Sequence, residues 1–176
     1  MNIWLKEISV EDGIEFGNLL IELSRYPDVY ARPVPSDFEM EEFEGFKKAR
    51  VRMASGENLP SGVKPTSTYW VMDDNIPIGY ATLKHEIDMN KPGGHFGLCL
   101  KKEYQNKGLG TVISDMLSEI AYNQLGITEV IFTSKNENIQ SQKSVDKIGA
   151  TLVKVQDGYH FYSLDLVKKF EDRKSK

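Results

Sequence analysis

The spacing of apolar residues predicts a chain in which strands and helices alternate. A strand is expected over residues 3–8, followed by a helix over 11–24, where apolar side chains recur at helical spacing. Ser9 and Asp12 have the spacing of a capping box at the start of that helix. Ser36 and Glu39 form a second such pair and predict another helix, acidic at its beginning and basic at its end, whose charges are expected to stay in water.

The pattern changes after residue 67. Residues 69–72 and 76–83 are rich in β-branched and aromatic residues around Asp73-Asp74-Asn75, which indicates a hairpin. Pro92-Gly93-Gly94 interrupts the chain before a further strand over 95–100. A long apolar stripe then predicts a helix from Leu109 that ends at Gly126. A strand at 129–133, a polar helix at 138–148, a strand pair at 151–155 and 160–166, and a charged, frayed tail from 168 complete the prediction.

Composition and charge restrict the class of protein. With 176 residues, 40% of them hydrophobic, the chain is expected to form one domain over residues 1–167, followed by the tail at 168–176. The net charge of -4 is spread along the chain without a basic stripe, so nucleic acid is not an expected partner. No apolar run has the length of a membrane span. The lone Cys99 and an N-terminus unlike a secretory signal predict a cytoplasmic protein, and neither a metal site nor a membrane partner is expected.

Residues 105–110 carry the chemical signal. They lie between a predicted strand and the long amphipathic helix, and a helix N-terminus leaves backbone amides free to bind an anion. Gly108 and Gly110 allow the backbone to approach a ligand closely, so these amides are candidates to hold a pyrophosphate. A glycine pair also serves plain turn geometry. The P-loop pattern is absent, and Ile113 stands where a dinucleotide fingerprint needs its third glycine.

Two motifs together resemble a known family. Gln105-Asn106-Lys107-Gly108-Leu109-Gly110 resembles the Q/R-x-x-G-x-G/A signature of the GNAT superfamily of acyl-CoA N-acyltransferases. Asn138 with Ser141, followed by Lys147 and Gly149, resembles its second block. The two blocks and the preceding hairpin cover roughly residues 68–166, and two matches in the right order are far less probable by chance than one.

The resemblance implies a fold and a cofactor. The fold would be α+β, a mixed and mostly antiparallel sheet of about six or seven strands with helices on both faces. Acetyl-CoA would insert its pantetheine arm where the strands around Leu98 and Val130 splay apart. The residues implied to contact it are Leu98, Cys99 and Leu100 for pantetheine, Gln105, Asn106, Lys107, Gly108, Leu109, Gly110 and Thr111 for the pyrophosphate, and Asn138 with Ser141 on the other side. Asn138 is also expected to be a helix N-cap, and both roles are compatible.

The sequence offers several candidates for the catalytic groups. Many relatives protonate the leaving thiolate with a tyrosine, and Val145 occupies the matching position. The family's base often lies on the strand that leads into the phosphate loop, but alternation places Gly94 and Phe96 there. A bulge at Gly97 would keep His95 as a candidate base, and Glu86 is the other. Each also has an ordinary structural interpretation. Cys99 is expected to be a packed side chain and not a nucleophile.

The predicted function is acetyl-CoA-dependent acetylation of a primary amine on a small molecule, an amino-acid derivative or a peptide, by a monomer or homodimer. One alternative is a non-catalytic acyl-CoA-binding module, which the absent tyrosine favours. Another is a structural domain whose glycine loop binds nothing. Four aromatic residues, Tyr26, Tyr30, Phe38 and Phe43, are candidates to line an acceptor pocket or simply to pack in the core.

Overall fold

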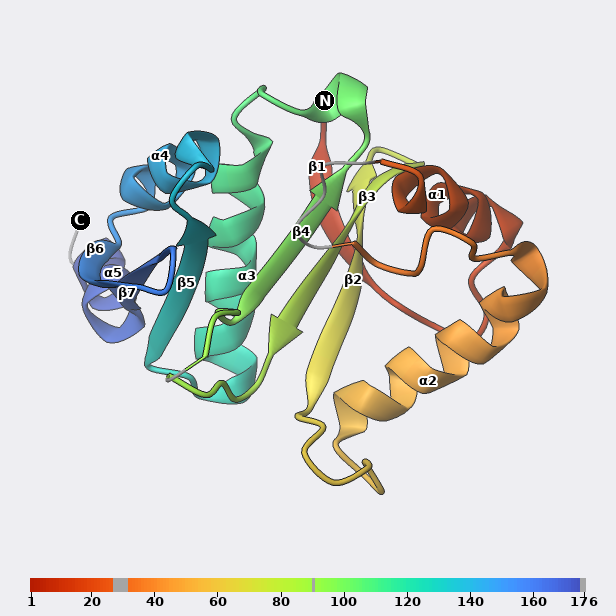
Figure 1. Ribbon diagram of the computed structural model, residues 1–176, viewed down its shortest axis with the longest axis horizontal. Coiled ribbons are helices and arrows are strands. Elements are labelled where there is room, and N and C mark those ends of the chain that lie inside the picture. The colour runs from red at the N-terminus through yellow and green to blue at the C-terminus, as the bar shows by residue number, and fades with distance from the viewer. Residues whose placement is uncertain (27–31, 90, 175–176) are drawn as a thin grey trace. The chain divides into compact units, whose positions relative to one another are not determined.

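The computed structural model describes residues 1–26, 32–89 and 91–174 (Figure 1). In chain order its elements are β1 (Ile3–Glu7), α1 (Ile14–Ser24), the 3-10 helix η1 (Met40–Glu42), α2 (Phe43–Ser55), β2 (Thr66–Asp73), β3 (Ile76–Lys84), β4 (Phe96–Leu100), the 3-10 helix η2 (Lys102–Tyr104), α3 (Leu109–Leu125), β5 (Glu129–Lys135), α4 (Ile139–Lys147), β6 (Thr151–Gln156), β7 (Tyr159–Asp165) and α5 (Leu166–Lys174). They belong to two compact units: Met1–Lys84 with Gly97–Lys107, and His85–Phe96 with Gly108–Lys176. The single domain expected over residues 1–167 stays a prediction.

The first unit is a four-stranded sheet in the order β1-β2-β3-β4, with α1 packed on β3 and α2 on β2 (Figure 1). Its core joins Phe16 and Leu20 from α1 to Trp70 and Tyr80 from the sheet. Trp70 is fully buried and stacks on Phe16 with ring centroids 4.9 Å apart. The amphipathic stripe of α1 therefore covers the face of the sheet that carries these aromatic rings.

The hairpin predicted around residues 73–75 is confirmed. Asp73 pairs with Ile76, which leaves Asp74 and Asn75 as the loop, and Asp74 adopts a left-handed φ of 50°. Asp and Asn tolerate this conformation better than other non-glycine residues, so the local sequence matches the two-residue turn. The strands reach further than predicted at the other end, where Thr66 and Ser67 join β2.

The capping box predicted at Ser9 and Asp12 is wrong. Helix α1 begins at Ile14, and Gly13 is its N-cap without a side-chain bond. Asp12 is buried, and its carboxylate accepts hydrogen bonds from the Trp70 indole at 2.6 Å and the Ser9 amide at 2.8 Å and pairs with Lys6. These tertiary partners hold the Asp12 carboxylate in the turn before the helix, so it fastens the β1–α1 connection to the sheet.

The second capping box is also displaced, from Ser36 and Glu39 to Glu39 and Glu42 at the start of η1. The expectation that all charges of this helix face water is wrong for Lys47, which is 3% exposed. Its ammonium group donates to the carbonyl oxygens of Val10 and Asp12 at 2.9 and 2.8 Å and pairs with Glu44 at 2.7 Å. A buried lysine needs such partners, and these fasten α2 to the same turn.

The second unit is a three-stranded sheet in the order β5-β7-β6, packed with α3, α4 and α5. The long apolar stripe of α3 is confirmed by its fully buried Ile113 and Ala121, and Gly126 ends the helix in a left-handed conformation. The prediction of a frayed tail from residue 168 is wrong up to residue 174, because these residues form part of helix α5. Phe170 stacks on Tyr122 at 5.2 Å, and Lys169 pairs with Asp115 at 2.9 Å.

Each strand pair whose register is described is antiparallel: β1 with β2, β2 with β3, β5 with β7, and β6 with β7. Over the described residues, no helix has the length and apolar character that crossing a membrane requires.

Candidate functional site

The loop from Gln105 to Gly110 leaves the end of β4 through a short, tightly bonded turn. The Lys101 amide donates to the Ile78 carbonyl at 2.9 Å and so extends the pairing of β4 with β3. The Gln105 side-chain amide donates back to the Leu100 carbonyl at 2.8 Å. Gln105 therefore fixes the start of the loop against the end of the strand, a role that its place in the motif alone does not indicate.

Two left-handed residues shape the rest of the loop. Asn106 has a φ of 58°, and Gly108, the N-cap of α3, has a φ of 78°. No heavy atom lies within 4 Å of the position where a Cβ on Gly108 would be, and residues 105–108 are exposed. Gly108 has no side chain to cap α3, and the Thr111 amide donates to the Gly108 carbonyl at 3.2 Å, so the amides of Leu109 and Gly110 are the ones left for a ligand. An open, uncapped helix N-terminus on a glycine fits a diphosphate.

The predicted pantetheine residues lie on β4. Leu98 is half-buried, whereas Cys99 and Leu100 are buried. Burial raises the pKa of the Cys99 thiol to about 11. Cys99 packs in the core of the first unit, which agrees with the expectation of a packed side chain and opposes a nucleophilic thiolate. Contact of these three residues with pantetheine stays a prediction.

Asn138 is the N-cap of α4, as predicted. Its side-chain oxygen accepts a hydrogen bond from the Ser141 amide at 3.1 Å. The Ser134 hydroxyl donates to the Asn138 carbonyl at 3.2 Å and ties the cap to the end of β5. Val145, at the position of the family's tyrosine, is buried at 6% exposure and offers no proton. Contact of Asn138 and Ser141 with the cofactor stays a prediction.

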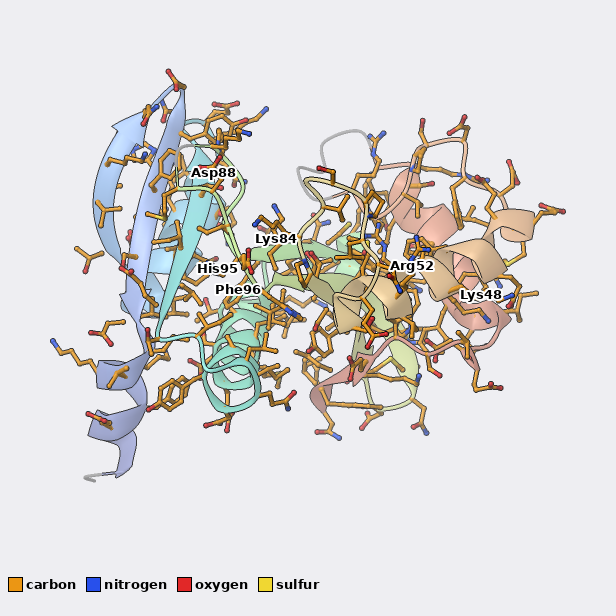
Figure 2. All side chains as sticks on the ribbon, turned by 90° about the horizontal axis from the view of Figure 1, so that it is seen from below. Lys48, Arg52, Lys84, Asp88, His95 and Phe96 are labelled. Carbon is orange, nitrogen blue, oxygen red and sulfur yellow. The ribbon has the colours of Figure 1, made fainter. Side chains whose placement is uncertain are left out.

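His95 lies before β4, so the alternation of strand side chains does not decide where it points (Figure 2). It is 6% exposed and is bonded twice to Ile131 of β5: its amide donates to the Ile131 carbonyl at 2.8 Å, and its Nδ1 accepts from the Ile131 amide at 2.9 Å. An Nδ1 that accepts leaves the proton of a neutral imidazole on Nε2. In this state neither ring nitrogen has a lone pair for a substrate proton, which favours the structural interpretation of His95.

The segment before His95 also bonds to β5, which the sequence did not indicate. The Gly93 and Gly94 amides donate to the Thr133 hydroxyl at 2.9 and 3.1 Å. A Cβ on Gly94 would lie 2.2 Å from the Ile131 carbonyl oxygen, so a side chain there would collide with the strand. The Gly93-Gly94 pair predicts an interruption before the strand, but such a pair also permits the close approach of two backbones that the structure has here.

The other candidates are spread over different environments. Glu86 is exposed in the segment after β3. Phe38 and Phe43 are buried in the core of the first unit, which supports their packing role, and Tyr26 packs partly buried against that core. Tyr30 lies outside the described residues. A shallow hollow on the exposed side of α2 is lined by Gly45, Lys48, Ala49 and Arg52, and Figure 2 labels Lys48 and Arg52. No acidic side chain is among these residues.

Within the described part of the chain, no group of three or more His, Cys, Asp or Glu side chains could hold a metal ion.

Several solved structures have the same fold. The N-acetyltransferase PseH of Campylobacter jejuni, solved with acetyl-CoA, aligns with a TM-score of 0.64 at 15% identity over 93% of this chain and 99% of its own. A probable acetyltransferase aligns with a TM-score of 0.71 at 17% identity over 94% of both chains. The spermidine N-acetyltransferase of Vibrio cholerae, solved with CoA and spermine, aligns with a TM-score of 0.67 at 13% identity over 96% of this chain and 98% of its own. No curated protein matches significantly.

The sequence itself shows the family. A model of the acetyltransferase (GNAT) domain matches residues 4–151, which is most of the chain. The match confirms the resemblance found in the two motifs, the mixed α+β fold, an acetyltransferase activity and acetyl-CoA as the acetyl donor. The chain belongs to the GNAT acetyltransferase family.

Proposed function

We propose that this acetyltransferase transfers the acetyl group of acetyl-CoA to a primary amine on a small molecule, an amino-acid derivative or a peptide, by direct attack of the amine. Structural neighbours that are themselves N-acetyltransferases support an amine acceptor. The observation that carries the donor half is the open, left-handed backbone of Gly108 at the uncapped start of α3. A cytoplasmic location and a monomer or homodimer are part of the same proposal.

The residues of the loop would hold the diphosphate of the donor. The backbone amides of residues 106–110 would supply the hydrogen-bond donors, and Lys107 would add a positive charge beside them. Thr111 would border the diphosphate in another way, because its amide donates to the Gly108 carbonyl at 3.2 Å. Leu98, Cys99 and Leu100 would offer backbone groups to pantetheine, and Asn138 with Ser141 would border the cofactor in addition to capping α4. When bound, acetyl-CoA supplies an activated acetyl thioester, and the protein's part is to orient the amine and accept its proton.

We assign that proton to Glu86 or to water, and not to His95. The Glu86 carboxylate is exposed, whereas both polar contacts of the His95 ring and amide with Ile131 serve the backbone of β5. With Val145 at the usual tyrosine position, the thiolate would leave without a tyrosine proton. This arrangement relies on the basicity of the acceptor amine and on positioning more than on a dedicated acid and base.

A pair of glycine variants tests the donor site. Gly108→Glu places bulk and negative charge where the phosphates would bind, and we expect it to abolish CoA binding measured by calorimetry. Gly126→Glu is the matched control, since Gly126 is also left-handed, has no heavy atom within 4 Å of its Cβ position and lies at the other end of the same helix. Both variants carry the same backbone strain of about 1 kcal/mol. Equal CoA affinity in the two folded variants would refute the site.

Turnover on amines tests the acceptor half. CoA release is followed with a thiol reagent over a panel of small amines, amino-acid derivatives and peptides. Tight CoA binding with no release on any amine would favour the non-catalytic module. Release without an acceptor would instead indicate hydrolysis of the thioester.

A further inference from the structure

The end of α1 is bonded to the turn that leads into the phosphate loop. The Tyr26 hydroxyl donates to a carboxylate oxygen of Glu22 at 2.7 Å and accepts from the backbone amide of Lys102 at 3.3 Å. The second carboxylate oxygen of Glu22 pairs with the Lys101 ammonium at 3.3 Å. The Lys102 ammonium lies 5.2 Å from the centroid of the Tyr26 ring. We call these four residues the α1 clamp; all of them belong to the first unit.

The clamp gives the Lys102 amide a hydrogen-bond acceptor that η2 itself cannot supply. Lys102 is the first residue of η2, and the first amides of a helix have no partner inside it. A tyrosine hydroxyl accepts one hydrogen bond while it donates another, so Tyr26 serves the Lys102 amide and Glu22 at the same time. Glu22 in turn uses one oxygen for Tyr26 and the other for Lys101. The contacts close on each other, which orients the hydroxyl toward η2.

The hydroxyl keeps its proton under ordinary conditions. Burial, followed by the hydrogen bond to Glu22, raises the pKa of Tyr26 to about 12. The bond to the Glu22 carboxylate therefore persists through the neutral and moderately alkaline range. While it persists, it keeps the hydroxyl oriented so that its oxygen accepts from the Lys102 amide.

The position of the clamp along the chain gives it a function. η2 ends at Tyr104, and the left-handed loop residue Asn106 follows two positions later. The Gln105 side chain ties the same turn to the Leu100 carbonyl. The turn is thus fixed from β4 by Gln105 and from α1 by Tyr26. Partly exposed ion pairs such as Lys101 with Glu22 contribute little stability, so the tyrosine contact with the backbone is the part of the clamp that matters most.

We propose that Tyr26, supported by Glu22, is a positioning residue for coenzyme A: it holds the Lys102 amide and thereby preorganises the loop that receives the diphosphate. This inference rests on the donor site of the proposed function. Preorganisation lowers the ordering cost of binding, so its loss raises the dissociation constant of CoA and the KM for acetyl-CoA. It leaves kcat and the KM for the amine unchanged, because Tyr26 itself does not touch the reacting atoms.

Tyr26→Phe tests the inference by removing the hydroxyl alone. We expect the CoA dissociation constant from calorimetry to rise about fivefold to tenfold, the value for one modest hydrogen bond. In the free protein, hydrogen exchange at the Lys102 amide should accelerate. Glu22→Gln keeps an acceptor for Tyr26 and should have a smaller effect. Tyr122→Phe is the matched control, since Tyr122 is also half-buried but stacks on Phe170 and is not part of the α1 clamp, and it should change neither quantity.

The two proposals fail in different ways. If Gly108→Glu abolishes CoA binding while Tyr26→Phe leaves the dissociation constant at the parental value, the positioning role is refuted and the donor site stands. Faster exchange at Lys102 with parental CoA affinity also refutes it, because the contact would then be purely structural. If Gly108→Glu binds CoA normally, the donor site falls and the positioning role falls with it.

Discussion

The two interpretations of His95, catalytic base or backbone partner, predict opposite results for one substitution. Replacing His95 with Asn puts the side-chain carbonyl oxygen on Cγ, where the imidazole carries Nδ1. It therefore keeps an acceptor for the Ile131 amide, which now lies 2.9 Å from Nδ1. His95→Gln keeps a polar group nearer the position of Nε2 but leaves the Ile131 amide without its partner. His95→Ala removes both nitrogens.

The magnitudes follow from the buried amide. An orphaned buried donor costs about 1–3 kcal/mol, so His95→Ala and His95→Gln should each lower the free energy of unfolding by at least that amount. His95→Asn should stay within about 1 kcal/mol of the parent, because the acceptor is retained. Urea denaturation measures these differences, and the slope of unfolding free energy against urea should not change among the variants.

Activity decides between the interpretations. A general base contributes about 10²- to 10⁴-fold to the rate, so a catalytic His95 would make the Asn variant inactive although it folds and binds CoA. We expect the Asn variant to retain most of kcat/KM for the amine and the shape of its pH profile. A folded, CoA-binding but inactive His95→Asn would refute our assignment. An Asn variant as unstable as the Ala variant would refute the hydrogen-bond argument itself.

Two further substitutions test the packing of the first unit. Asp12→Ala removes the acceptor of the buried Trp70 indole and the partner of Lys6, so it should destabilise the fold by about 3–5 kcal/mol in urea, whereas the exposed Asp37→Ala should cost less than about 0.5 kcal/mol. The pKa of the Cys99 thiol is raised to about 11, so the unfolded thiol ionises near pH 9 while the folded one stays protonated. The parent should therefore lose up to about 2 kcal/mol of stability relative to Cys99→Ala as the pH rises from about 9 to 11; a constant difference would show that the thiol is not buried.

The sequence predicted the elements whose conformation depends on contacts between residues close together in the chain. Helix α3 has an apolar stripe long enough to mark both its ends, and Gly126 stops it through its own backbone freedom. The Asp73-Asp74-Asn75 turn and the Asn138 cap likewise depend on contacts within a few residues. The two ordered GNAT blocks identified the family for the same reason, because each is a short segment whose spacing is set by one turn and one helix.

The predictions failed where a side chain makes its main contact with a residue far away in the sequence. Asp12 has the spacing of a capping residue, but the Trp70 indole 58 positions away and Lys6 use its carboxylate instead. Lys47 looks like a solvent-facing charge on a polar helix and becomes buried, since two carbonyl oxygens and Glu44 surround its ammonium. The charged sequence from residue 168 predicts a frayed tail, but the Phe170 ring stacks on Tyr122. Sequence spacing carries no information about these long-range contacts.

In the candidate site, too, local features were predictable from the sequence and features that depend on distant residues were not. The shape of the loop was predictable because it depends on the backbone alone: a left-handed glycine N-cap at the start of one helix needs no partner from elsewhere. Its contact with the diphosphate stays a prediction. The base was not predictable, because a base is defined by its surroundings. Strand alternation does not govern His95, which precedes β4, and its Nδ1 accepts a hydrogen bond from the Ile131 amide 36 positions away. Gly94 supports this account, since only a residue without a Cβ lets the chain lie against the Ile131 carbonyl and bring His95 into register with it. Because the amide and the Nδ1 of His95 both bond to the backbone of Ile131, the imidazole has a structural role in the sheet. For this reason we propose Glu86 or water as the proton acceptor.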